Sequence, residues 1–477
     1  MRKFKFFESK VLSRTEPGIA ELTQNELITA TGGGGNVYFG DAHGNVTVAS
    51  SSFAPVAILR AHASHVSYLK YLPSENILVT IGDGIDVRTD SQVERSKHAA
   101  RTAALAAETA NVPIKMRSSL EDEEKHRVRS CATAKFWKIS QRKDEKLEFE
   151  LLNVVRLVTE SILCFDVSSS SLILGTEDGR VILWSDVMKK RSPKPCIIRK
   201  KQKDSSVNAV QFSSGNIIFV VTSKSVETYD TSTQRGVRIL NESNGAPRVG
   251  CTTLLESQIA VAQSDGAVYL YVLFEFVSKC NHGFKYIEHR YTSELKGKCF
   301  AFQNQIERVR WVQNRYLLVE SVNERGIHQI DIQDLEHRLV VSHFPLRHKS
   351  VLLFVFEEWG RIFLVTSNHE IVELKEKNMT QKLGLLFNLD LFDVAVSLGS
   401  FRGENNKNSD ALDTNVITKM YADHLFEKED YDAAIQKYIL TNSVEPSYVI
   451  SRFMTRHRFG NIAQYVVVFE CYISQDS

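Results

Sequence analysis

Three short stretches contain residue types that bind metals or phosphate groups. His62 and His65 lie three residues apart in "HASH". On a strand this spacing points the two side chains to opposite faces, so we expect loop histidines and no metal site. The run 31–36, "TGGGGN", lacks the Lys-Ser/Thr of a phosphate-binding loop and precedes a strand pattern, which favours a flexible loop. The acidic spacing in 82–90 lacks the glutamate of a calcium loop. None of the three predicts a metal or a cofactor.

The densest charge cluster in the chain is basic and lies in a proline-containing segment after Trp184. It consists of Lys189, Lys190, Arg191, Lys194, Arg199, Lys200, Lys201 and Lys203. A polybasic segment gains about 1 kcal/mol per Lys or Arg near acidic lipid, so contact with an anionic membrane surface is one interpretation. The alternative to membrane contact is a solvated loop between strands that has no binding role. A nuclear-localisation signal has less support than either.

Composition sets the outer bounds on function. With 477 residues, 43% hydrophobic and 24% charged, the chain has the profile of a globular protein with more than one folding unit. A net charge of +2 gives no reason to expect nucleic acid as a partner. The seven cysteines are scattered and show no CxxC pair, which predicts that most of them are reduced core residues. The chain shows no GxSxG elbow, no HExxH motif, no apolar run long enough to span a bilayer and no signal peptide. We therefore expect a cytosolic protein that is not an enzyme.

The elements that would position these segments are paired strands. A unit of apolar run, tight polar turn and apolar run recurs, with turns at 43–44, 83–84, 178–179, 224–225, 265–266, 323–324 and 368–369. The intervals are roughly 40 to 60 residues, close to one four-stranded propeller blade, except for one of about 95. A polar insertion over about 85–132 explains that exception. The pattern predicts a seven-bladed WD-like β-propeller over 1–376, with "KFKFF" at 3–7 pairing with the last blade to close the ring. Stacked β-sandwiches are the alternative fold.

From about Lys377 the apolar spacing becomes helical. In 381–398 the apolar residues recur at three- and four-residue steps, which predicts one helical face. Two further helices joined at 428–430 have the spacing of tetratricopeptide-like helix pairs. Two more helices are predicted at 447–455 and 459–469. We expect a truncated α-solenoid over 377–477, so that the fold class is all-β followed by all-α. Four residues of the first helix pair are candidate contacts to a partner: Tyr421, Leu425, Tyr431 and Tyr438.

Several of these segments together resemble a known family. They include "NVYFGDAHGNV" at 36–46, "GTEDGRVILW" at 175–184, "EEWGRIFLVTSNHEIVEL" at 357–374 and "YADHLFEKEDYDAAIQKYILTNSVEPSYVISRFM" at 421–454. The chain resembles subunit eleven of the class C vacuolar protein sorting core over residues 3–464, most specifically over 357–454. Members of that family have a propeller followed by a clathrin-repeat-like solenoid, in agreement with the patterns above.

The resemblance implies a scaffold subunit of the HOPS and CORVET membrane-tethering complexes. The implied partners are the other class C subunits, the Rab-binding subunits and, indirectly, Rab GTPases and SNAREs, on the cytosolic face of late endosomes, lysosomes or vacuoles. Family members continue to a RING zinc finger, and this sequence has no such Cys/His pattern, so RING-dependent roles are not expected of it. A membrane-coat or other interaction scaffold is the alternative function, because coat subunits share this layout. An enzyme with its site in the propeller channel is a third.

Overall fold

The computed structural model describes most of the chain. The described residues are 3–12, 17–22, 26–84, 131–141, 147–157, 161–189, 193–202, 205–213, 217–231, 238–241, 245–256, 258–272, 274–279, 285–290, 299–302, 304–347, 349–368, 370–400, 412–441, 444–455 and 458–473. The proposed insertion thus lies almost wholly outside the described residues. The chain divides into two compact units, one of residues 9–333 and 343–375, and one of residues 1–8, 334–342 and 376–477.

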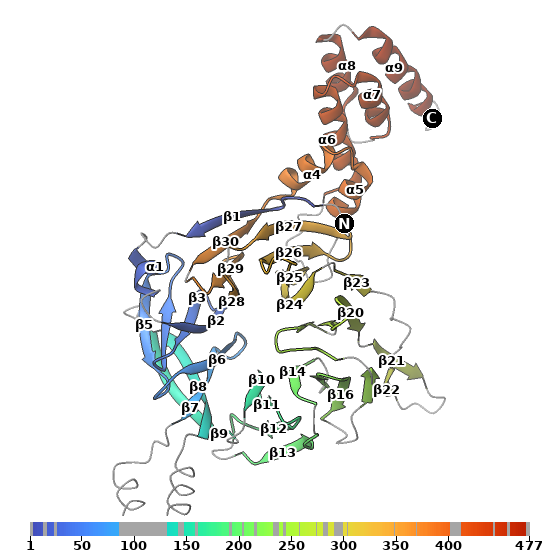
Figure 1. Ribbon diagram of the computed structural model, residues 1–477. Helices are drawn as coiled ribbons and strands as arrows, with labels where there is room; N and C mark the ends of the chain where they lie inside the picture. Colours follow the sequence, from blue (N-terminus) through green and yellow to red (C-terminus); the bar gives the residue numbers. More distant parts are fainter. Residues whose placement is uncertain are drawn as a thin grey trace, which may run out of the picture. The chain divides into compact units, whose positions relative to one another are not determined.

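Within the described residues, seven four-stranded antiparallel sheets are the blades of a propeller (Figure 1). The first three blades are β2 (Leu27–Gly33), β3 (Asn36–Asp41), β4 (Asn45–Ala49) and β5 (Pro55–Arg60); β6 (Val66–Leu72), β7 (Ile77–Gly84), β8 (Cys131–Gln141) and β9 (Leu147–Arg156); and β10 (Ile162–Val167), β11 (Ser171–Thr176), β12 (Val181–Ser185) and β13 (Pro195–Arg199).

The fourth to sixth blades repeat this order. They are β14 (Val207–Phe212), β15 (Ile217–Thr222), β16 (Val226–Asp230) and β17 (Arg238–Asn241); β18 (Thr252–Leu255), β19 (Gln258–Ala262), β20 (Ala267–Val272) and β23 (Cys299–Ala301); and β24 (Gln305–Val312), β25 (Tyr316–Val322), β26 (His328–Asp334) and β27 (Leu339–Pro345). A two-stranded ribbon, β21 (Phe274–Lys279) with β22 (Lys285–Arg290), comes between the last two strands of blade five and was not predicted.

The seventh blade closes the ring with a strand from the start of the chain. It consists of β28 (Leu352–Glu358), β29 (Arg361–Thr366), β30 (Ile371–Glu376) and β1 (Phe7–Leu12). The prediction that the start of the chain pairs with the last blade is therefore confirmed, but the strand that does so is β1, which begins at Phe7, the last residue of "KFKFF". Lys3 instead forms a parallel bridge with Val340, and the amide of Phe6 donates to the carbonyl of Val341 at 2.8 Å.

The hairpin turns follow the local chemistry of the sequence. Gly44 and Gly179 both adopt φ 86°, a left-handed conformation that glycine reaches without steric cost. The buried Asp41 side chain accepts bonds from the amides of His43 and Asn45, at 2.9 and 2.8 Å. The connections 42–44 and 177–180 are longer than the two-residue turns that the sequence suggested, and carry glycine near their end.

One predicted turn is wrong. Asp83 and Gly84 continue β7 and pair with Ala132 and Cys131 of β8, so the connection between these two strands is 85–130. Asp and Gly are common turn residues, which is why the sequence suggested a turn here. In the structure, the pairing of β7 with β8 continues through both residues.

The core of the propeller lies between neighbouring blades. Phe39 of blade one meets Phe356 of blade seven edge to face, with ring centroids 5.4 Å apart. Phe136 of blade two and Trp184 of blade three belong to one buried cluster. Strands of alternating or continuous apolar character bury both faces of each sheet in this way, as a closed ring of sheets requires. A short helix, α1 (Pro17–Leu22), buries Ile19 and Leu22 against the cluster of blades one and seven.

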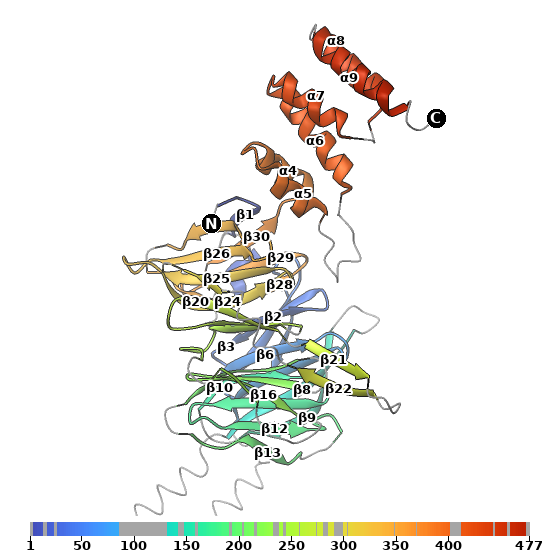
Figure 2. The ribbon, with the colours of Figure 1, turned by 90° about the vertical axis from the view of Figure 1, so that its right-hand side faces the viewer.

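The helical unit contains α4 (Met379–Phe387), α5 (Phe392–Ser400), α6 (Thr414–Glu427), α7 (Tyr431–Ile439), α8 (Pro446–Thr455) and α9 (Phe459–Ile473), drawn in orange to red in Figures 1 and 2. The single helical face predicted over 381–398 is two helices. The break has a local cause: Asn388 caps α4 by donating to the carbonyl of Gly384 at 3.1 Å, and Asp390 adopts φ 55°, which no helix continues through. The junction between α6 and α7 lies at 428–430 as predicted.

Candidate interaction site

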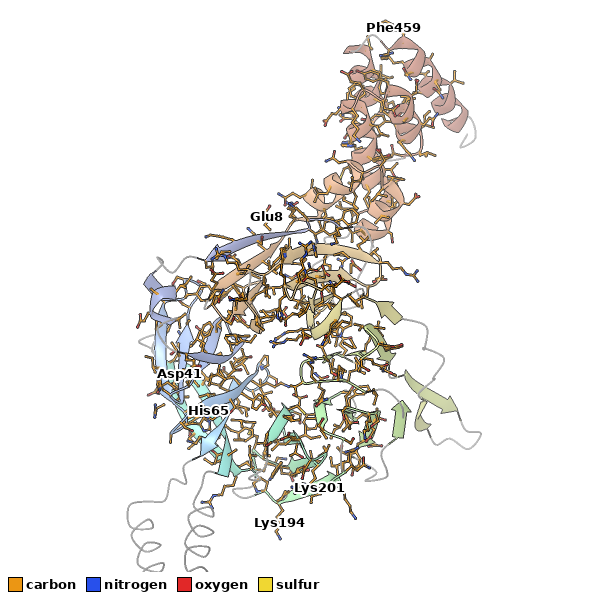
Figure 3. All side chains as sticks on the ribbon, in the orientation of Figure 1. Glu8, Asp41, His65, Lys194, Lys201 and Phe459 are labelled. Carbon is orange, nitrogen blue, oxygen red and sulfur yellow. The ribbon has the colours of Figure 1, made fainter. Side chains whose placement is uncertain are left out.

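The basic segment lies along the outermost strand of blade three. Its four described lysines, Lys189, Lys194, Lys200 and Lys201, are all exposed. Figure 3 shows Lys194 and Lys201 at the outer rim of the ring beside β13. The Lys201 amine lies 3.5 Å from the Asp178 carboxylate and is 70% exposed, so this ion pair is a solvated one. Lys190, Arg191 and Lys203 lie outside the described residues.

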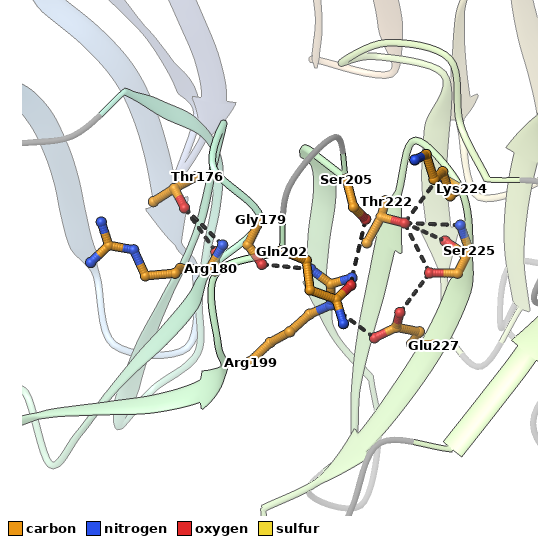
Figure 4. Close-up of polar contacts among 10 residues, drawn as sticks. All are labelled: Thr176, Gly179, Arg180, Arg199, Gln202, Ser205, Thr222, Lys224, Ser225 and Glu227. Atoms are coloured by element: carbon orange, nitrogen blue, oxygen red, sulfur yellow. Dashed lines mark hydrogen bonds and ion pairs between the residues drawn. The ribbon is translucent and has the colours of Figure 1, made fainter.

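Arg199, the fifth described member of the segment, has a different role. Its side chain is buried and lies 3.2 Å from Glu227 of the next blade (Figure 4). Its Nη1 donates to the carbonyl of Gly179 at 2.6 Å, and its Nη2 donates to Ser205 at 3.1 Å. Arg199 therefore joins blades three and four and is not available to an outside ligand, which corrects its place in the predicted surface.

The partner of Arg199 is itself held by a turn. Ser225 donates to Glu227 at 2.5 Å, and Thr222 accepts bonds from the amides of Lys224 and Ser225 at 3.1 and 2.9 Å (Figure 4). Because the Glu227 carboxylate is buried, the bonds that it accepts from Ser225 and Arg199 offset part of its desolvation, while Thr222 holds the turn that carries Ser225. The cluster is a structural joint between blades.

The four tyrosine and leucine positions of the first helix pair pack inside the helical unit. Tyr421 is 8% exposed, Leu425 5%, Tyr431 8% and Tyr438 0%. Tyr438 also donates to the Asp423 carboxylate, and burial together with this bond raises the Tyr438 pKa. These side chains form the core of the helix pairs. The prediction that they contact a partner is therefore wrong, because they are buried in this core.

His62 is a loop histidine, as predicted, but it has a structural task that the sequence did not reveal. Its Nε2 lies 2.8 Å from Oγ1 of Thr80, which also accepts a bond from the Trp137 indole at 3.1 Å. Burial, and then the positive charge of Lys135, lower the His62 pKa to about 4. A neutral imidazole thus joins the loop before β6 to the two middle strands of blade two. Nothing in the spacing of the sequence connects His62 with Trp137.

The glycine-rich run is an ordered hairpin and not a flexible loop. Gly34 and Gly35 form its turn, with φ 64° and 80°. A Cβ at Gly32 would lie 2.0 Å from the Glu357 carbonyl of blade seven, and one at Gly33 would lie 2.0 Å from the ring of Tyr71 in blade two. The absent side chains let three blades approach one another here.

Two searches of the described part of the chain bear on the class of protein. No group of three or more His, Cys, Asp and Glu side chains there could hold a metal ion. None of the described helices combines the length and the apolar character that crossing a bilayer requires. Among the cysteines whose side chains the structure describes, Cys251 is buried, Cys164 half-buried and Cys196 exposed, and each is free.

The fold and these surfaces define a seven-bladed β-propeller protein with C-terminal helix pairs. The sequence model of the PEP5/VPS11 N-terminal family matches residues 2–89 and 120–376. The chain belongs to this family.

Relatives and solved structures extend the comparison. The vacuolar protein-sorting-associated protein 11 homologue of Arabidopsis thaliana is 24% identical over 98% of this chain and 44% of its own length. The homologue of Dictyostelium discoideum is 21% identical over 98% of this chain and 46% of its own length. The chain thus spans less than half of either relative. The β-propeller domain of Myceliophteria thermophila Cps50 (Swd1) covers 74% of this chain and 97% of its own, with 10% identity and a TM-score of 0.49. The propeller assignment stands on the sheet topology itself.

Proposed function

We propose that the chain is a non-catalytic scaffold subunit of a complex that tethers endosomal, lysosomal or vacuolar membranes before fusion. The observation that carries the proposal is the similarity to vacuolar protein-sorting-associated protein 11 homologues along 98% of the chain. The family match over the propeller supports it. Its partners would be the other class C vacuolar sorting subunits and the Rab-binding subunits, and it would reach the membrane through the complex.

The mechanism that suits this architecture is multivalent attachment. Buried clusters join the seven blades, and the helix pairs have a core of their own. Both parts therefore present outer surfaces to which several partners can bind, and this mode of binding does not require a deep pocket. Linking several weak contacts in one assembly raises the effective concentration of each partner, so avidity grows without a single tight interface. The polar clusters of the propeller described above serve its own blades.

Affinity purification of the tagged 477-residue chain from cells tests the proposal. We expect the other class C subunits and Rab-binding subunits among the recovered proteins. An unrelated seven-bladed propeller with the same tag serves as the control. Recovery of coat proteins in place of the sorting subunits would contradict the tethering role, and so would a recovery no different from the control.

A further inference from the structure

The outer rim of blade two exposes aliphatic side chains. In β9, its outermost strand, Leu151 is 45% exposed, Leu152 42% and Val154 37%. A register shift explains how two consecutive leucines both reach solvent. Trp137 of β8 pairs with Leu151 and its neighbour Phe136 pairs with Asn153, so Leu152 is the additional residue of a β-bulge. Bulges turn a side chain away from the alternation of the strand.

This apolar rim is joined to the basic segment of blade three. The side-chain amide of Asn153, between Leu152 and Val154, donates to the carbonyl of Val187 at 2.5 Å. Val187 precedes Lys189 by two residues, in the connection from β12 to β13. Figure 1 shows β9 and β13 in neighbouring blades at the lower edge of the ring.

The rim of blade three also exposes an aliphatic side chain, and lysines lie on either side of it in the sequence. Ile197 is 54% exposed in the middle of β13, with Lys194 before this strand and Lys200 and Lys201 after it. We call Lys189, Lys194, Lys200 and Lys201 the basic rim residues, and Leu151, Leu152, Val154 and Ile197 the apolar rim residues. Exposed lysines thus flank the exposed Ile197 on both sides along the chain.

We propose that the rim formed by β9 and β13, together with Lys189 and Lys194, binds directly to the surface of a membrane that contains anionic lipids. The lysines match the negative headgroups, and the aliphatic side chains match the boundary between headgroups and acyl chains. Nucleic acid offers phosphates to the lysines but no partner for four exposed aliphatic side chains, because base stacking uses aromatic ones. An exposed apolar strip bordered by polar residues is also typical of an interaction site.

The proposal goes beyond the proposed function and does not depend on it, because binding is measured with the purified chain alone. The experiment is flotation of the 477-residue chain with phosphatidylcholine vesicles, with and without phosphatidylserine, at low and high salt. We expect binding to the acidic vesicles that weakens with salt. Each lysine near an acidic surface strengthens binding about fivefold, so replacing all four basic rim residues by Gln is expected to weaken binding by up to about 600-fold.

A matched variant separates the rim from net charge. Lys5, Lys224, Lys349 and Lys375 are also exposed, and their replacement by Gln removes the same charge elsewhere. This control is expected to bind as the unaltered chain does. For the apolar part, Leu151→Ser/Leu152→Ser/Ile197→Ser is compared with Val249→Ser/Val351→Ser/Leu389→Ser, whose side chains are also exposed. Only the rim variant is expected to lose binding.

Three results would overturn the proposal. The first is that the unaltered chain does not bind acidic vesicles. The second is that the two lysine variants lose binding equally, which would mean that only net charge matters. The third is that the chain binds soluble polyglutamate as well as it binds vesicles, which would indicate an acidic protein partner. Circular dichroism of each variant verifies that a loss of binding does not come from unfolding.

Discussion

The indole of Trp359 donates a hydrogen bond to the carbonyl of Gly35 at 3.0 Å, and this bond joins the seventh blade to the first. The amide of Gly35 donates in return to the carboxylate of Glu358 at 3.0 Å. The glycine-rich hairpin and the turn after β28 therefore fasten the ring at the place where its first and last inner strands meet. The closing strand β1 acts at the outer edge of the same blade.

Replacing Gly32 by Ala is expected to weaken this junction. The new Cβ would lie 2.0 Å from the Glu357 carbonyl, a backbone atom that cannot move without shifting β28. We expect a loss of about 2 kcal/mol or more in the free energy of unfolding, measured by urea denaturation. Gly384→Ala is the matched control. Nothing lies within 4 Å of its new Cβ in α4, so it should raise helix stability by up to about 1 kcal/mol. Equal effects of the two changes would disprove the close approach.

His62 is expected to make the stability of blade two depend on pH. Its folded pKa of about 4 lies below the ordinary value of 6.5, so the unfolded chain binds the proton more readily. The stabilisation is complete above about pH 6.5 and is lost as pH falls toward 4, by at most about 3 kcal/mol. His62→Gln should flatten this slope in urea titrations at a series of pH values. His43→Gln, in an exposed turn, should keep it. A slope that persists in His62→Gln would assign it to other groups.

The sequence predicted what depends on neighbours along the chain. Turn residues, the change from a two-residue to a helical period and the junction near Lys428 are local signals, and the blades and helix pairs follow from them. His62, Thr80 and Trp137 could not be connected, because 57 residues separate the last two and only the ladder of β7 and β8 brings them together.

The candidate sites were harder to predict for a related reason. Arg199 has the same charge as the lysines beside it, and its partner Glu227 comes from another blade. Tyr421 and Tyr438 have the spacing of a helix face, but periodicity does not say whether that face meets the protein's own core or a partner. The structure buries both.

Arg199→Met is expected to destabilise the propeller by about 3 to 5 kcal/mol, because it leaves the buried Glu227 carboxylate without its counter-ion. The double change Arg199→Met/Glu227→Met removes both charges and should recover a large part of this loss. Lys200→Met, at the exposed neighbour, should change stability by less than about 0.5 kcal/mol. Thermal denaturation of the unaltered chain, these three variants and the single variant Glu227→Met checks the order. Additive effects of the two single changes would show that the pair is not coupled.

Asp423 is expected to hold the helix pairs together. Its carboxylate accepts from Arg452 of α8 at 2.6 Å and from Tyr448 of α8 at 2.9 Å, and it also accepts from Tyr438 of α7. Asp423→Ala would leave a guanidinium and two hydroxyls without this acceptor, at a cost of about 3 kcal/mol. Hydrogen exchange should then quicken in α7 and α8 and stay unchanged in the blades, since each unit has its own core. Glu427→Ala, exposed on the same helix, is the control and should leave exchange unaltered. Faster exchange throughout the propeller would mean that the two units unfold as one.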